Sequence, residues 1–504
     1  MLHSSQTLIK PLKNLTISTP NITKCLLAIC IFALFTFYYF SPILPAVSTW
    51  PSYCLDRNRL LNTRISTSTR PEQKTNISHI LFGIGGSAKS WTLRRHYSEL
   101  WWQPNITRGF VWLDENPKKS LQYLRPVISP DYKISADTAR LKYTCKNGPR
   151  SAVRLARIVK ESFELGLENV RWFVMGDDDT VFFTENLVNV LSKYDHEQMY
   201  YIGSNSESVN QNRFHSYEMA YGGAGFAISY PLAAELVRLL DGCINRYAEN
   251  YGSDQKIGKC MNEIGVPLTN ELGFHQLDIR GNASGLLSTH PLAPLVSLHH
   301  LDYVEPLFPD LNRFDSLRKL MHAYKSDPSR ALQQSFCYDL TRNWSISVSW
   351  GYGVQLYPFL MRPYELSTTL QTFVTYAKSN GPFMFNTREL KPDPCKMPIQ
   401  FYFDGVEKFE NRSTLTLYNK IDDDDDHDND NNKKKKICDN KNYKDAYLIK
   451  GFRVSAGLFD PQLWNKARRR QLCEITRDAY KQKQVNVVNL RIRGFGQRES
   501  VTPP

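Results

Sequence analysis

The chain has 504 residues, 41% of them hydrophobic and 12% aromatic, which is enough to bury a large core in two or three domains. Its formal net charge of +13 at pH 7 is compatible with anionic ligands such as sugar nucleotides. The Lys and Arg residues are scattered rather than aligned in stripes, which argues against nucleic acid as a partner.

The N-terminal region predicts a membrane anchor. Residues 25–47 are apolar and uncharged, long enough at about 1.5 Å per residue to cross a hydrocarbon core of roughly 30 Å. Lys10, Lys13 and Lys24 precede this run and no acidic residue does, so residues 1–24 are expected to be a cytoplasmic tail and the remainder lumenal. A cleaved signal peptide is the alternative, but the apolar run is long and lacks a small-residue cleavage site.

The residues after the anchor have features of a lumenal protein. Their eight cysteines are an even number, as expected for disulfide bonds in an oxidising compartment. Cys243 and Cys260 are the nearest pair in sequence and the first expected bridge; the other pairings cannot be read from the sequence. Glycosylation sequons occur at Asn76, Asn105, Asn282, Asn343 and Asn411.

The elements that follow alternate between strands and helices. After an aperiodic stem at residues 48–76, the pattern predicts strands at 79–86, 109–114, 199–204 and 221–229, with a further strand that begins at 171 and ends in the aspartates at 177–179. It predicts helices at 89–102, 149–166, 185–194 and 231–242. This alternation predicts an α/β domain over residues 77–310, a Rossmann-like sheet with helices on both faces. Ligands bind such sheets at the carboxyl ends of the strands, here Gly83–Gly86, Asp114–Glu115 and Asp177–Asp179.

The C-terminal part has a different texture. Residues 311–504 contain short runs rich in Trp, Tyr and alternating apolar residues, including 401–409, 444–454 and 485–495, and predict a β-rich accessory region. A segment at about 420–440 holds five consecutive aspartates followed by a lysine run. It has no apolar flank and predicts a disordered insert.

A second aspartate run, Asp177–Asp179, lies between two apolar segments in RWFVMGDDDTVFF. Carboxylates at the end of a core strand are costly unless a cation or solvent compensates them, and a hard divalent ion with oxygen ligands is the simplest compensator. The run at 422–426 shows that aspartates alone prove little. The apolar context of Asp177–Asp179 therefore indicates a metal presented to a phosphate-bearing ligand.

Six segments occur in an order that resembles the Fringe-like glycosyltransferases of glycosyltransferase family 31. They are FGIGGSAKSW with RRHYSELWW, VWLDE, WFVMGDDDTVFF, YGGAGFAIS, YGSDQKIG and GVPLTNELGFHQ, over residues 79–276. The chain is most similar to the plant Fringe-related branch, whose C-terminal extension has no firm function. The resemblance implies a GT-A fold, a single-pass type II Golgi membrane protein, and inverting Mn²⁺-dependent transfer from a UDP-sugar to a glycan or glycoprotein hydroxyl, forming a β-1,3 linkage.

The resemblance also implies roles for the aspartates. Asp179 corresponds to a metal ligand, Asp178 to a nucleotide contact, and Asp177 to a further, water-mediated ligand. The remaining metal ligand is a histidine: His299 in VSLHHLD, similar to a segment of the core-1 galactosyltransferases, is preferred to His275 in GFHQLD. Ordinary packing or hydrogen bonding is the alternative for either histidine.

Asp254 in YGSDQKIG matches the catalytic aspartate of the family and is expected to take the proton of the acceptor hydroxyl. The family has a second acid where this chain has Ser253, and a helix cap is the alternative for both residues. The remaining candidates are expected on the donor side: Arg94 in the donor-binding segment, Asp114 with Glu115 near uridine or ribose, and Gly222, Gly223 and Gly225 where backbone approaches a ligand.

Two other classes of function compete with a transferase. A catalytically silent lumenal glycan-binding or scaffold protein could retain the same fold. A secreted hydrolase with paired carboxylates would need neither a nucleotide nor an uncleaved anchor.

Overall fold

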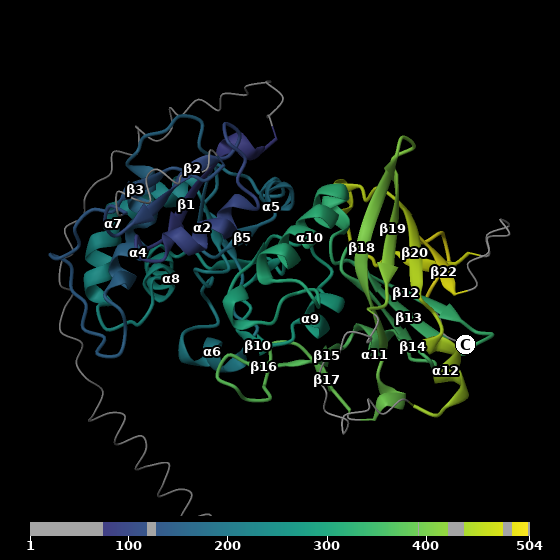
Figure 1. The fold of residues 1–504 in the computed structure, drawn as a ribbon. Coiled ribbons are helices and arrows are strands. Elements are labelled where there is room, and N and C mark those ends of the chain that lie inside the picture. The colour runs from purple at the N-terminus through teal and green to yellow at the C-terminus, as the bar shows by residue number, and fades with distance from the viewer. Residues whose placement is uncertain (1–73, 118–127, 392, 422–437, 477–485, 502–504) are drawn as a thin grey trace, which may run out of the picture. The chain divides into compact units, whose positions relative to one another are not determined.

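The computed structural model describes residues 74–117, 128–391, 393–421, 438–476 and 486–501 (Figure 1). These lie in one compact unit, Gln73–Pro504. The expected anchor at 25–47, the tail before it, nearly all of the stem and the aspartate run at 422–426 fall outside the described residues. Within the described part of the chain, no helix is long and apolar enough to cross a membrane.

A seven-stranded sheet forms the N-terminal part, in the order β3-β2-β1-β4-β7-β6-β8. Its strands are β1 Ile80–Gly85, β2 Arg108–Leu113, β3 Tyr132–Ile134, β4 Trp172–Asp177, β6 Tyr201–Gly203, β7 Phe226–Ser229 and β8 Leu268–Asn270. Strands β1 to β4 are parallel to one another, whereas β7 runs antiparallel to β4 and β6, and β6 pairs parallel with β8. Every residue of the central strand β1 is buried, as expected for a parallel strand covered on both faces.

Helices cover both faces of the sheet, as the sequence predicts. They are α2 Trp91–Glu99, α4 Ser151–Phe163, α5 Thr184–Leu191, α7 Tyr230–Arg246 and α8 Ser253–Ile264. The short helix α6, Val209–Phe214, contributes no side chain to the apolar clusters that the described residues form on the two faces. Alternate residues of β1 and β4 divide between two apolar clusters. One cluster includes side chains of α2 and α5, and the other includes side chains of α4, α7 and α8.

The end of α7 differs from the prediction. Gly242 was expected to end this helix, but α7 continues to Arg246. Cys243 and Ile244 are fully buried beyond that glycine, and the expected Cys243–Cys260 disulfide ties α7 to α8. Packing against a neighbouring helix therefore outweighs the low helix propensity of one glycine. Two further disulfides join Cys337 to Cys473 and Cys395 to Cys438.

The C-terminal region is rich in β structure and contains a closed barrel in the order β12-β13-β14-β18-β19-β20-β22-β21. Its strands are β12 Gln334–Asp339, β13 Trp344–Ser349, β14 Gly353–Tyr357, β18 Ile399–Phe409, β19 Ser413–Asn419, β20 Gly451–Gly457, β21 Leu472–Ile475 and β22 Val487–Arg493. The expectation of a strand over 444–454 is wrong in its first half. Helix α12, Lys441–Tyr447, begins where the Asn440 side chain accepts a hydrogen bond from the amide of Asn442.

Smaller elements join the sheet to the barrel. They are β5 Val181–Phe182, β9 Phe274–His275, β10 Ile279–Gly281, α9 Ser284–Ser288, β11 Ser297–Leu298, α10 Arg313–Ser326, α11 Pro363–Ser367, β15 Thr369–Gln371, β16 Phe373–Thr375 and β17 Thr387–Glu389. Strand β10 pairs antiparallel with β16, beside it in Figure 1. A strand of the expected catalytic domain thus pairs with one from the expected accessory region.

Candidate metal centre and adjoining pocket

The aspartate run forms a tight turn between β4 and β5. The Thr180 amide donates to the Asp177 carbonyl at 3.0 Å, and the Asp177 amide donates to Thr180 Oγ1 at 2.9 Å. The Thr180 hydroxyl donates to the Gly223 carbonyl at 2.7 Å, and Trp101 Nε1 donates to the Thr180 carbonyl at 3.1 Å. These hydrogen bonds fix the turn and therefore the direction in which the three carboxylate side chains point from the end of the central sheet.

Strand pairing brings His299 to this turn. Strand β5 pairs antiparallel with β11 in a register that places Leu298 opposite Val181, so the next residue, His299, lies beside the aspartates. His299 Nε2 is 3.1 Å from Asp179 Oδ1 and 3.7 Å from Asp177 Oδ2. One ligand atom from each of the three residues lies within 4.8 Å of the others.

The composition of this trio fits a divalent cation. The side chains of His299 and Asp179 are 4% and 2% exposed, and that of Asp177 is 39% exposed, so the trio is buried on one side and open on the other. Carboxylate and imidazole ligands suit first-row divalent metals, including Mn²⁺. His299 Nδ1 has no hydrogen-bond partner among the described residues, so protein contacts alone do not satisfy this buried ring.

The charges of the trio are strongly coupled. Partial burial, together with the neighbouring Asp179 and Asp178 carboxylates, raises the pKa of Asp177 to about 7. Burial alone would lower the pKa of His299, but the Asp179 carboxylate raises it to about 9. Burial would also raise the pKa of Asp179, yet His299 and Arg94 hold it well below its usual range. Without a metal, a proton on His299 therefore balances the Asp179 carboxylate.

Asp178 faces helix α2. Its two carboxylate oxygens accept hydrogen bonds from Arg94 Nη1 at 2.9 Å and from the Ser90 hydroxyl at 3.1 Å. Arg94 Nη2 also lies 3.2 Å from Asp179 Oδ2. Burial and the neighbouring Asp179 raise the pKa of Asp178, although Arg94 opposes this shift. The sequence predicts a nucleotide contact for Asp178 and a metal ligand for Asp179. The two carboxylates have different surroundings in the structure, and Arg94 contacts both of them.

Asp114 closes the loop between β1 and α2. Its carboxylate accepts hydrogen bonds from the Ala88 amide at 2.8 Å and the Ser87 hydroxyl at 3.0 Å. Burial opposes ionisation of Asp114, but these bonds keep its pKa below the usual value. The neighbouring Glu115 is exposed and only its amide contacts Asp114. Asp114 therefore shapes the loop in front of Arg94 whether or not it also contacts a nucleotide.

Two charged residues of this region were not among the candidates that the sequence suggested. Arg154 of α4 donates to the Gly86 carbonyl at 2.7 Å and to the Trp112 carbonyl at 3.0 Å, so it holds the ends of β1 and β2. No motif marks it. Asp302 lies 3.5 Å from Arg94 and accepts a 2.6 Å hydrogen bond from the Tyr97 hydroxyl. Asp302 belongs to the same LHHLD segment as His299, and this shared segment is the signal by which the sequence could have revealed it.

Asp254 lies in the first turn of α8, after the capping residue Gly252. Its carboxylate accepts hydrogen bonds from the Gln255 amide at 2.8 Å and the Gly222 amide at 3.3 Å. Burial raises the pKa of Asp254, which strengthens it as a base. Asp254 and Asp177 both line a small cavity of about 30 Å³, so the base candidate adjoins the metal candidates.

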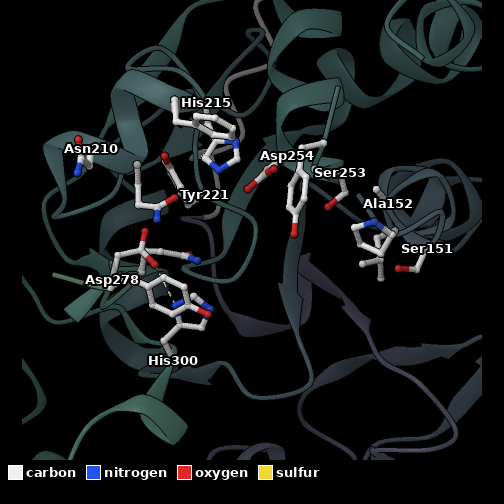
Figure 2. A pocket seen from close by; sticks show the side chains of 17 residues that line it. Ser151, Ala152, Asn210, His215, Tyr221, Ser253, Asp254, Asp278 and His300 are labelled. Atoms are coloured by element: carbon white, nitrogen blue, oxygen red, sulfur yellow. Dashed lines mark hydrogen bonds and ion pairs between the residues drawn. The ribbon is translucent and has the colours of Figure 1, made fainter. Parts of the chain in front are cut away.

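A larger pocket of about 690 Å³ shares Asp254, Ser253 and Leu155 with this small cavity. Figure 2 shows Asp278 and His300 on one side of this pocket and Ser151 with Ala152 on the other, with Asp254 between them. Its wall also includes the aromatic residues Phe214, His215, Tyr221, Tyr251 and Tyr376. A ligand in this pocket would therefore reach Asp254 directly.

His275 is not part of the metal candidate. Its Nδ1 is 3.1 Å from Glu207 Oε1 and its Nε2 is 2.9 Å from His290 Nε2. Both ring nitrogens are therefore engaged with other side chains. Of the two histidines that the sequence suggests, the structure brings only His299 to the aspartates.

Gly223 makes room for His299. A Cβ atom added at residue 223 would lie 2.0 to 2.5 Å from three atoms of the His299 ring. Gly225 adopts a positive φ of 82°, and a Cβ there would meet Phe182 at 2.7 Å. Protein side chains thus fill the space at Gly223 and Gly225, and the approach of a ligand to the glycines stays a prediction.

We expect the substitution Gly223→Ala to lower Mn²⁺ affinity by about 10- to 100-fold, the usual effect of disturbing a ligand's support. The added methyl group must displace the His299 ring, whereas the backbone bond to Thr180 can remain. Isothermal titration with MnCl₂ measures the affinity, and Gly457→Ala on β20 is the control because nothing lies within 4 Å of its added Cβ. Unchanged affinity in the Gly223 variant would show that His299 is not a ligand.

Comparisons with known proteins also find a Fringe-like region in this chain. The family described as "Protein of unknown function, DUF604" matches residues 211–473, and the family described as "Fringe-like" matches residues 127–290. The chain is 29% identical over 174 residues to "Beta-1,3-N-acetylglucosaminyltransferase lunatic fringe" of Gallus gallus. That alignment covers 30% of this chain and 44% of the relative, so the chain spans less than half of its length.

Two solved structures were also similar. The catalytic domain of Drosophila β1,4-galactosyltransferase 7, in complex with xylobiose, has a TM-score of 0.22 and 10% identity, covering 38% of this chain and 64% of that one. Mouse xyloside xylosyltransferase 1 in its apo form has a TM-score of 0.26 and 11% identity, covering 38% and 84%.

Proposed function

We propose that this chain, which belongs to the DUF604 family and contains a Fringe-like region, is an inverting glycosyltransferase that uses a UDP-sugar. The observation that carries the proposal is the Asp177–Asp179–His299 trio at the end of β4, adjoining Asp254. The named activity of the lunatic fringe relative supports a β-1,3 linkage. A glycan or glycoprotein is the acceptor in this proposal.

The residues divide into a donor side and an acceptor side. Asp177, Asp179 and His299 would hold a divalent cation, which supplies charge neutralisation for the diphosphate and stabilises it as a leaving group. Arg94 and Asp178 lie on the same donor side of the site and orient the nucleotide. On the opposite side, Asp254 takes the proton of the acceptor hydroxyl as its oxygen bonds to the anomeric carbon and the bond to UDP breaks. Attack from that side inverts the anomeric centre.

Donor screening tests this proposal. The full-length chain, purified in detergent, is incubated with UDP-galactose, UDP-glucose, UDP-N-acetylglucosamine and UDP-xylose, and UDP release is measured with MnCl₂ and with EDTA. We expect Mn²⁺-dependent release from at least one donor. If no donor is turned over and UDP does not bind in the presence of Mn²⁺, the silent glycan-binding alternative replaces the enzyme.

The location is part of the same proposal. A signal anchor at residues 25–47 would place the described residues in the Golgi lumen as a single-pass type II membrane protein. Asn105, Asn343 and Asn411 are exposed and available for N-glycans there. A mass shift on glycosidase treatment of the expressed chain supports this location, and unmodified asparagines at all three positions contradict it.

Metal affinity is expected to rise with pH. The metal binds deprotonated ligands, whereas His299, with a pKa of about 9, and Asp177, with a pKa of about 7, carry protons near neutrality. Between pH 7 and 8, metal binding displaces the proton of His299, so affinity should rise about tenfold. Between pH 6 and 7, metal binding displaces a second proton, from Asp177, and the rise should be steeper. Mn²⁺ titrations at pH 6, 7 and 8 measure both slopes, and a flat profile would contradict the ligand set.

The substitution Asp177→Asn provides the matched comparison, because it removes only the group that titrates near pH 7. We expect this variant to bind Mn²⁺ more weakly and to lose the additional slope between pH 6 and 7. Its slope between pH 7 and 8, which depends on His299, should remain.

A further inference from the structure

We propose that residues 373–385 of the accessory region form a wall of the acceptor site, and that this site takes a neutral saccharide unit of the acceptor. The inference rests on the proposed function, because it identifies the 690 Å³ pocket beside Asp254 as the acceptor side of a sugar transfer. It assigns part of the C-terminal extension to substrate recognition.

The composition of the pocket indicates the chemistry of its occupant. None of the described residues that line it is Lys or Arg, and two of them, Asp254 and Asp278, are carboxylic acids. Phosphate-bearing ligands need cationic partners, so the diphosphate belongs on the other side, near Arg94. The side-chain amides of Asn210 and Gln211 and the carboxylate of Asp254 instead suit the hydroxyl groups of an uncharged sugar.

Tyr376, directly after β16, is the accessory residue in the pocket wall. Its amide donates to the Asp278 carbonyl at 2.9 Å. Its ring is stacked with His300 at 5.3 Å between centroids and 19° between planes. Arg280 lies over the Tyr376 ring at 4.5 Å, so the tyrosine is held in place by groups from the sheet-bearing part of the chain. It therefore presents a fixed surface to the pocket.

The same segment also supports α6, on another part of the wall. The Val209 amide donates to the Pro382 carbonyl at 3.2 Å, and the Met384 amide donates to the Glu207 carbonyl at 2.8 Å. A β-bridge pairs Ser208 with Phe383. The accessory segment is thus hydrogen-bonded to Glu207, just before α6, and to Val209, the first residue of α6.

Phe214, at the end of α6, supplies an exposed aromatic surface in the pocket. Its side chain is 74% exposed although it is large and apolar, and it lies edge-on to His215 at 4.9 Å. An exposed aromatic ring in a pocket that also offers a few polar groups is typical of a ligand-binding surface. The apolar face of a sugar ring is the part of a saccharide that such a surface contacts.

The test separates acceptor recognition from donor chemistry. Tyr376→Ala, Tyr376→Phe and Phe214→Ala are compared with the wild-type full-length chain and with Tyr364→Ala, a 69% exposed tyrosine of the accessory region outside the pocket. Two rates are measured with Mn²⁺ and the best donor: UDP release without acceptor, and transfer to p-nitrophenyl β-glycosides of galactose, glucose, N-acetylglucosamine and xylose.

We expect Tyr376→Ala and Phe214→Ala to raise the KM for the accepted glycoside by about tenfold or more, the effect of losing one good aromatic contact. Acceptor-independent UDP release should stay within about twofold of wild type in both variants. Tyr376→Phe, which keeps the ring, and Tyr364→Ala should match wild type in both rates.

Two results overturn the inference. If wild type transfers sugar and neither alanine variant changes the acceptor KM, the segment is not part of the acceptor site. If Tyr376→Ala lowers UDP release as much as transfer, the tyrosine acts on the metal centre through His300, which is stacked on His299 at 4.0 Å. Failure of the proposed function is a different result, namely no UDP release by the wild-type chain from any donor.

Discussion

The substitution Asp179→Asn should reduce Mn²⁺-dependent UDP release and sugar transfer by about 10³-fold, equivalent to about 4 kcal/mol of transition-state stabilisation. Asp179 is the carboxylate closest to His299 Nε2 and is 2% exposed, so no water-exposed group can take its place. The amide has the same shape but cannot supply the negative charge that faces His299 and Arg94. Steady-state UDP release and Mn²⁺ titration measure the effect.

A matched control guards against a general effect of changing an aspartate. Asp404→Asn alters an exposed aspartate on β18 and should leave both measurements unchanged. Circular dichroism should show that the Asp179 variant is folded, because the turn is held by backbone bonds and by Thr180. A folded Asp179→Asn variant with wild-type turnover would exclude this site as the metal centre.

The substitution Asp254→Asn should lower the rate of transfer by about 10²- to 10⁴-fold, the range for loss of a general base. The asparagine oxygen can still accept the hydrogen bond from the Gln255 amide, so helix α8 should keep its first turn. UDP and Mn²⁺ affinities should change little, because Asp254 lies on the side of the acceptor. Single-turnover transfer together with UDP titration separates these effects.

Comparison with the variant Ser253→Ala distinguishes a role of Asp254 in proton transfer from a role in capping helix α8. Ser253 is the neighbouring residue at the start of α8 and also lines the pocket, but it carries no titratable carboxylate. If Asp254 only stabilises the helix, its asparagine variant should melt at a lower temperature and retain the transfer rate per folded molecule. If it is the base, the melting temperature should hold and the rate should fall.

The sequence predicts the sheet well because its signals are local. Apolar runs such as Ile80–Gly85 and Trp172–Asp177 have the length and composition of buried strands, and they become β1 and β4. The helix at 149–166 is predicted by its apolar spacing and becomes α4. Gly242 misleads because the burial of Cys243 and Ile244 against α8 is a tertiary contact that no local pattern encodes.

The metal candidates are predictable for a different reason. Asp177 and Asp179 share one turn, and His299 is suggested by its segment, although 120 residues separate it from Asp179. What decides between His299 and His275 is the register of β5, β9 and β11, which the sequence does not reveal. The pocket wall is harder still, since Tyr376 reaches it only because β16 pairs with β10.

That pairing has a consequence for any attempt to prepare a smaller protein. A chain shortened to end near residue 310 would leave β10 without β16 and expose the backbone groups of an open strand edge, which favours aggregation. It would also lose the main-chain partners of residues 207–209. Truncation near residue 310 is therefore a poor route to a minimal enzyme. Because residues 373–385 and 205–215 contact each other, substitutions in one segment should be accompanied by substitutions in the other across related chains.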